Sequence, residues 1–303
     1  MRHRIFWTAL LIGFIIFFIG IPSVSASKGT LSHTINLAGK QRMLTQKMSK
    51  EAFFIAKGIH VQRNKQRLAR SIALFEKTLQ GLFRGDKDLG LVRTKNRTIR
   101  YQLYRVKRLW KPFRRYVKLV QRGKTSRWVL RQVERRNLPL LRAMDRAVQM
   151  FEKQVKKASK KLTPDLAHKI NLAGKQRMLT QKMTKELLLI SLNMNKKKNK
   201  LNLTRTTDLF ALTLQGLFRG DRYLKLKRTK QTTIRSQLHK VRRLWRQYWD
   251  KVIWKAMKGT ITKKRLEIAD KLNPNLLYQM DKAVRLYEQL ADGSLEDEDD
   301  LLY

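Results

Sequence analysis

Apolar residues recur every three or four positions along most of the chain, and long segments contain neither glycine nor proline. This spacing gathers the apolar side chains on one face of an α-helix, so the pattern predicts helices and not strands. Glycine and polar positions interrupt it at regular places. We expect helices over residues 28–59, 63–85, 96–122, 126–161, 164–196, 199–220, 231–258 and 261–291.

The pattern is duplicated. Residues 35–51 (INLAGKQRMLTQKMSKE) return as residues 170–186 with one change, from Ser49 to Thr184. A repeat this long is a duplicated domain, because solenoid units span only ~20–50 residues. Four helices with short connections form an up-down bundle. The short link at Lys161–Thr163 should start the fifth helix at the pole where the first began. We therefore predict an all-α protein: two tandem up-down four-helix bundles packed side by side as a pseudo-dimer, with their first helices parallel.

The ends of the chain suggest an export signal and a tail. Arg2 and Arg4 precede an apolar run over residues 5–21, and Val24-Ser25-Ala26 offers the small residues that a signal peptidase reads. We expect cleavage after Ala26 and a periplasmic location; an uncleaved inner-membrane anchor is the alternative. The predicted divisions are a signal peptide at 1–26, bundles at 27–162 and 163–291, and an acidic disordered tail at 292–303.

A formal net charge of +47 implies anionic partners. Lysine and arginine are spread over the whole length and are not gathered in one segment, which is typical of solvated helix faces. Binding to a polyanion or to anionic lipid is the sharper interpretation, whereas nucleic acid is not favoured for an exported protein. The absence of cysteine excludes disulfides and leaves the compartment open.

The first helix carries one arginine on a face of small residues. On a helical wheel, Leu37, Leu44 and Met48 form the core face. The opposite strip consists of Ala38, Arg42, Thr45 and Ser49, flanked by Ile35, Gly39 and Gln46, and its second copy contains Ala173, Arg177, Thr180 and Thr184.

If the first and fifth helices meet along these strips, Arg42 and Arg177 face each other, and an anion between them would be favoured. The alternative is an ion pair inside each bundle, and from the residues alone this alternative is preferred. Its candidate partners are the recurring acidic residues Asp86, Asp145, Glu152, Asp221, Asp281 and Glu288.

The motif Asn-x-Ala-Gly-x-x-Arg-Met, at residues 36–43 and 171–178, resembles the first-helix signature of the NarX/PilJ-type sensor domain. That family occurs in nitrate/nitrite sensor kinases and type IV pilus chemotaxis transducers, and the resemblance implies an extracytoplasmic four-helix bundle. In its nitrate sensors, the motif arginines of two protomers bind nitrate across the dimer axis. The resemblance therefore assigns ligand binding to Arg42 and Arg177, with Gly39 and Gly174 allowing close approach. We add Asn36, Asn171, Gln46 and Gln181, which lie on the same helices, as further candidate ligand-binding residues.

The chain departs from this family in two respects. The second membrane span, the HAMP linker and the kinase or methyl-accepting domain of typical members are not found in the sequence. Lys40 and Gln41 differ from the box of the nitrate kinases and are closer to the pilus-transducer branch. Nitrate is therefore one candidate ligand among several.

Enzymatic chemistry is not expected, because the sequence contains no P-loop, no nucleophile triad and no paired carboxylates. His33 and His168 recur but lack partners at metal-ligand spacing, so we expect no metal and no cofactor. The predicted function is an exported, stand-alone sensor that binds a small anion such as nitrate or nitrite, or a partner, between its bundles. It would signal through a separate membrane receptor; homo-oligomerisation is left open. The alternative function is a basic helical protein that binds polyanions or anionic lipid.

Overall fold

The computed structural model describes residues 30–155, 162–259 and 261–295, and the chain is helical through most of them. The helices are α1 (Leu31–Ala56), α2 (Val61–Arg84), α3 (Arg97–Gln121), α4 (Arg127–Gln154), α5 (Pro164–Ser191), α6 (Lys196–Arg219), α7 (Thr232–Tyr248), α8 (Trp254–Lys258) and α9 (Lys263–Asp292). A π-helical turn, Trp249–Ile253, connects α7 to α8, so that these form one interrupted helix. The predicted all-α fold class is confirmed.

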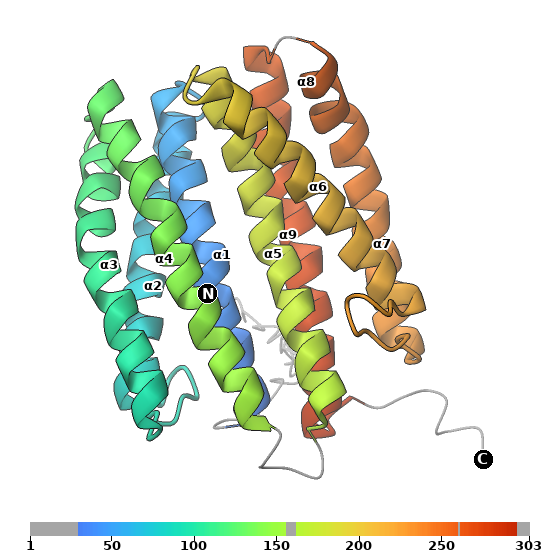
Figure 1. The fold of residues 1–303 in the computed structure, drawn as a ribbon. Helices are drawn as coiled ribbons and strands as arrows, with labels where there is room; N and C mark the ends of the chain where they lie inside the picture. The colour runs from blue at the N-terminus through green and yellow to red at the C-terminus, as the bar shows by residue number, and fades with distance from the viewer. Residues whose placement is uncertain (1–29, 156–161, 260, 296–303) are drawn as a thin grey trace, which may run out of the picture.

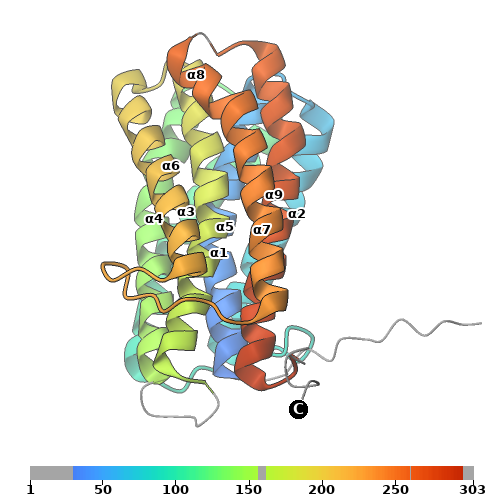
Figure 2. The same ribbon diagram turned by 90° about the vertical axis from the view of Figure 1, so that its right-hand side faces the viewer.

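The helices form two bundles side by side, α1–α4 and α5–α9, with α1 and α5 adjacent at the centre (Figure 1). A view at right angles shows the helices of both bundles standing nearly upright (Figure 2). Residue numbers increase in the same direction along the contact between α1 and α5. Gln46 accepts from Lys185, and further along Lys57 donates to the carbonyl of Ser191. These two central helices therefore run parallel, as the length of the link predicted.

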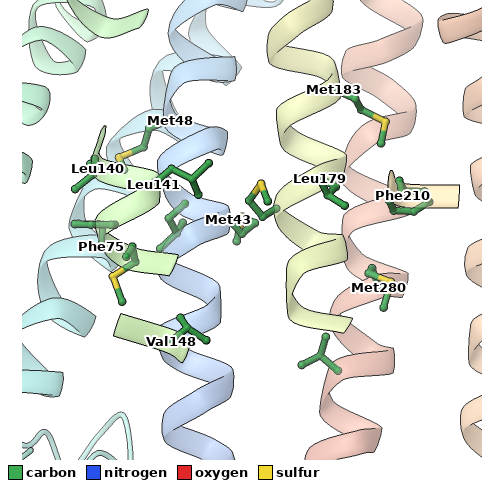
Figure 3. Close-up of a cluster of buried hydrophobic side chains, with 14 of the residues drawn as sticks. Met43, Met48, Phe75, Leu140, Leu141, Val148, Leu179, Met183, Phe210 and Met280 are labelled. Atoms are coloured by element: carbon green, nitrogen blue, oxygen red, sulfur yellow. The ribbon is translucent and has the colours of Figure 1, made fainter. Parts of the chain in front are cut away.

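Each bundle contains its own apolar core. Met48 and Phe75 are fully buried in the first bundle, and Met183 and Phe210 in the second (Figure 3). Met43, also buried, lies between the bundles in the same view. Burial of apolar surface therefore continues across the contact between α1 and α5, which favours a joined arrangement of the two bundles.

The sequence predicted the start of α5 correctly but placed its end several residues too late. Thr163 caps α5, as expected, by accepting from the backbone N–H of Leu166. However, α5 ends at Ser191 and not near residue 196, because Asn193 and Asn195 adopt φ values of 52° and 47°. Asparagine tolerates this left-handed conformation better than most residues, so it can end a helix without glycine.

Several predicted features fall at the edges of the described residues. The signal sequence with its cleavage site after Ala26, and residues 296–303 of the tail, lie outside them. Asp292, predicted to begin the tail, is instead the last residue of α9, which Gly293 ends in the left-handed conformation. Within the described ranges, no helix has the length and apolar character that a membrane crossing requires.

Candidate ligand site between the two bundles

Arg42 lies near the middle of α1, and its guanidinium is almost completely buried, with 1% of the residue exposed. Long side chains on a helix point back toward its N-terminus, which carries this guanidinium toward the start of α5. Its Nη1 donates to Oδ1 of Asp145 on α4 at 2.7 Å, and its Nη2 donates to the backbone carbonyl of Asn171 on α5 at 3.0 Å. Arg42 therefore binds a carboxylate of its own bundle and the backbone of the other.

Arg177 repeats this arrangement from α5 and is equally buried. Its Nη1 donates to Oδ1 of Asp281 on α9 at 2.5 Å, and its Nη2 donates to the backbone carbonyl of Asn36 on α1 at 3.1 Å. The two arginines thus form reciprocal hydrogen bonds between the bundles, related by the pseudo-twofold axis.

Gly39 and Gly174 leave the space into which the two guanidiniums fit. A Cβ atom added to Gly39 would lie 3.4 Å from Nη2 of Arg42 and 3.5 Å from Nη2 of Arg177. The same distances, with the arginines exchanged, apply at Gly174. Both guanidiniums therefore converge on one small region, which the repeated glycines keep free of side-chain atoms.

The charge at this centre is balanced within each bundle. Burial lowers the pKa of the Arg42 guanidinium, Asp145 opposes that shift, and Arg177 adds to it. Burial alone would raise the pKa of Asp281, but nearby Arg177 brings it below its usual value. The ion pairs within the bundles, which the sequence offered as an alternative, are thus present. The Nε atoms of both arginines are buried and form no hydrogen bond within the described chain.

The side chains of Asn36 and Asn171 were expected to bind the ligand, but in the structure each donates to a glutamate of the opposite bundle. Asn36 Nδ2 donates to Oε2 of Glu288 on α9, whose Oε1 pairs with Nδ1 of His33. This contact raises the pKa of His33, although burial opposes it. Asn36 therefore reaches the arginine centre through its backbone carbonyl, and its side chain belongs to a contact between the two bundles.

The second copy repeats that contact. Asn171 Nδ2 donates to Glu152 on α4, which also pairs with Nδ1 of His168 at 2.7 Å. The pKa of His168 is raised for the same reason. Both recurring histidines are therefore held by a glutamate of the opposite bundle, and Glu152 and Glu288 join the bundles together.

Gln46 and Gln181 belong to a separate polar cluster, and no hydrogen bond joins either glutamine to an arginine within the described ranges. Gln46 Oε1 accepts from Nζ of Lys185 at 2.8 Å, and Asn137 Oδ1 accepts from the same Nζ at 3.0 Å. On the other side, Gln181 Nε2 donates to Asn273 Oδ1 at 2.9 Å.

Lys50 and Lys185 are functional candidates that the sequence reading did not identify. Lys50 Nζ donates to Asn273 Oδ1 at 2.8 Å, so each lysine reaches an asparagine of the opposite bundle. Burial lowers the pKa of Lys50 to about 7 and that of Lys185 to about 8. Their recurrence within the repeated motif was the available signal, but an isolated lysine on a helix is usually solvated.

Only part of the small-residue strip contributes to the contact between α1 and α5 that the helical wheel suggested. The carbonyl of Thr45 accepts from Asn137 of α4 in the same bundle. The hydroxyl of Thr184 pairs with Tyr248 and accepts from Asn273, both in its own bundle. These threonines therefore contact their own bundles, whereas the arginines of the same strip also reach the other bundle through Nη2. The flanking positions Gly39 and Gln46 contribute to the same contact between α1 and α5.

Among the residues that the structure describes, no group of three or more histidine, cysteine or acidic side chains is placed to hold a metal ion. In the comparison with protein families, the model described as type IV pili methyl-accepting chemotaxis transducer N-term matches residues 24–136 and 164–266. The two matched segments begin before α1 and at α5, so they correspond to the two bundles. No curated protein matches the chain significantly.

Proposed function

Because this chain belongs to the PilJ family of type IV pili chemotaxis transducer N-terminal domains, we propose that its two bundles form a periplasmic sensor that binds a small anion. The candidate ligands are nitrate, nitrite or an anion of similar size. The observation that carries the proposal is the convergence of two buried arginines, one from each bundle, beside Gly39 and Gly174.

The hydrogen bonds of these arginines suggest how an anion would bind. Nη2 of each guanidinium donates to a neutral backbone carbonyl of the opposite helix, and Nε forms no hydrogen bond with any residue that the structure describes. An anion offers a stronger, charge-assisted hydrogen bond than a carbonyl does. The aspartates on Nη1 can remain in place, because the bound anion would interact with the other donors.

This exchange of partners would also produce a signal. In the structure, the Nη2 bonds to the backbone carbonyls of Asn36 and Asn171 join α1 to α5 directly. A bound anion would replace both bonds with a shared bridge, so the ligand would favour a different packing of the two bundles. We propose that a separate membrane receptor responds to that change.

Thermal unfolding with nitrate, nitrite or chloride, at constant ionic strength, tests the site. Nitrate or nitrite should raise the melting temperature of the wild type more than chloride does, because a ligand stabilises the state that binds it. Arg42→Met and Gly39→Ala should each remove this gain, the first by deleting donors and the second by filling the space beside both Nη2 atoms. Arg115→Met, which changes an exposed arginine of α3, is the matched control. The site is refuted if all variants retain the anion effect.

Binding of a polyanion or of anionic lipid is the second candidate function. The formal charge of +47 supports it, as do the exposed aromatic side chains Tyr101, Tyr104 and Trp128 beside basic residues of α3 and α4. Such binding should weaken steeply as salt rises, because counterions are released on association. Binding at the buried arginines should depend on salt much less. Titrations with heparin and with nitrate at two salt concentrations separate the two candidates.

A further inference from the structure

A pocket of about 300 Å³ lies between the bundles and is lined by residues other than the two arginines of the centre. Its walls come from α1 and α2 of the first bundle and α9 of the second. The floor and sides are largely apolar, formed by Met43, Leu44, Leu74, Pro274, Leu277 and Tyr278. This volume is at the lower end of the range for small-molecule sites, which often lie between domains.

The charged residues of the pocket are unbalanced. Five basic side chains line it, from Lys40, Lys47, Lys50, Arg67 and Arg70, against the carboxylates of Glu51 and Asp281. Glu51 already accepts from Lys47, and Asp281 pairs with Arg177. Both carboxylates therefore already have a positively charged partner, and neither forms an ion pair with the remaining basic side chains of the pocket.

Two of these cations form no hydrogen bond or ion pair among the described residues. Lys40 is half-buried on α1, and its pKa is lowered by burial, an effect that Asp281 only partly offsets. Arg70 is exposed on α2, which forms another wall of the pocket. By contrast, Arg67 binds Asp270 at 2.8 Å, and Lys50 has an amide partner. Unpaired cations on two walls of an apolar pocket are complementary to an anion that carries an apolar group.

From this geometry we infer that the pocket between α1, α2 and α9 binds a small organic carboxylate, with its charge at Lys40 and Arg70 and its apolar part against Leu74, Leu277 and Tyr278. An inorganic anion would leave the apolar walls unused, and a neutral compound would leave the cations unpaired. Lys40 lies close enough to Asp281 for the two charges to interact, so occupancy would also bear on the ion pair of Arg177.

The tandem repeat provides matched controls. Lys175 and Arg205 occupy the positions in the second repeat that correspond to Lys40 and Arg70. The opposite side of the molecule differs in side chains, since Asn202 replaces Arg67 and Arg142 replaces Tyr278 at the corresponding positions. Variants at Lys175 and Arg205 therefore make the same chemical change without altering the pocket.

Calorimetric titration of the full chain with benzoate tests the inference, with benzyl alcohol as the neutral analogue and nitrate as the inorganic one. Benzoate should bind at least tenfold more tightly than benzyl alcohol. Lys40→Met should weaken it at least tenfold, and Arg70→Met about threefold, because the exposed charge is better screened. Lys175→Met and Arg205→Met should leave the affinity unchanged.

Three results would overturn the inference. The first is equal affinity for benzoate and benzyl alcohol. The second is equal loss in the variants of both repeats. The third is loss of benzoate binding in Arg42→Met with none in Lys40→Met, which would assign benzoate to the arginine centre. Failure of nitrate to bind anywhere would instead bear on the proposed anion sensor, so the two proposals fail separately.

Discussion

Replacing Lys50 with methionine should stabilise the protein near neutral pH. The ammonium group of Lys50 is buried, with 2% of the residue exposed, and its hydrogen-bond acceptor is the amide of Asn273 and not a carboxylate. Its pKa falls from 10.5 to about 7 because burial penalises the charged form. At ~1.4 kcal/mol per pKa unit, that difference corresponds to about 5 kcal/mol of destabilisation.

The sign of the pH dependence follows from proton binding. Between pH 7 and 10.5 the unfolded chain carries the Lys50 proton and the folded chain does not, so stability rises with pH across this window. Below about pH 7 both states carry the proton and the full penalty remains. Methionine keeps most of the aliphatic stem, but Asn273 loses one of its two donors, which costs about 1 kcal/mol. We expect a net gain of about 2–4 kcal/mol at pH 7.

Chemical denaturation of the wild type and Lys50→Met at several pH values measures the difference. The gain should be largest at and below pH 7 and should vanish by about pH 10.5, because the lysine is then neutral in both states. Subtracting the wild-type curve removes the contribution of every other titrating group. Lys200→Met, which changes an exposed lysine of α6, should alter stability by less than ~0.5 kcal/mol at any pH. A pH-independent loss of stability in Lys50→Met would refute the reasoning.

Four further outcomes are expected. Arg42→Ala should lower the ligand-free stability by about 2 kcal/mol in denaturation experiments, because it strands Asp145, which is 30% exposed and can partly hydrate. Residues 27–162 alone should dimerise in sedimentation experiments, since a second copy of α1 can replace α5; a stable monomer would contradict this. His33→Gln should cost most below about pH 6.5 and progressively less as pH rises through the raised pKa of the histidine, which pH-dependent melting can follow. N-terminal sequencing of the native protein should find cleavage after Ala26, and an intact N-terminus would argue for an anchor.

The repeat and its helical period carried enough information to predict the bundles and the parallel central helices. The short link before Pro164 fixed the direction of α5, and the recurrence of Arg42 as Arg177 predicted that the two would meet. A helical wheel orders the faces of a helix relative to one another but does not show which neighbour each face contacts. For this reason the wheel did not show that Thr45 and Thr184 form hydrogen bonds within their own bundles.

The unusual environments of Lys50 and Lys185 could not have been predicted from the repeat in the same way. Lys50 and Lys185 acquire their unusual environment from Asn273 and Asn137, which are distant in sequence and belong to the opposite bundle. Only the packing of the two bundles brings each pair together and excludes water. The extent of burial, which decides the pKa, is therefore a property of the assembled fold and not of the motif.

The short connection between α4 and α5 has an evolutionary consequence. In a dimer of identical chains, every substitution appears on both sides of the symmetry axis, so the two sides must change together. A single chain with two bundles is free of that constraint, and its bundles stay at high effective concentration however dilute the protein becomes. The two flanks can then differ in sequence, as they do where Tyr278 corresponds to Arg142 and Arg67 corresponds to Asn202.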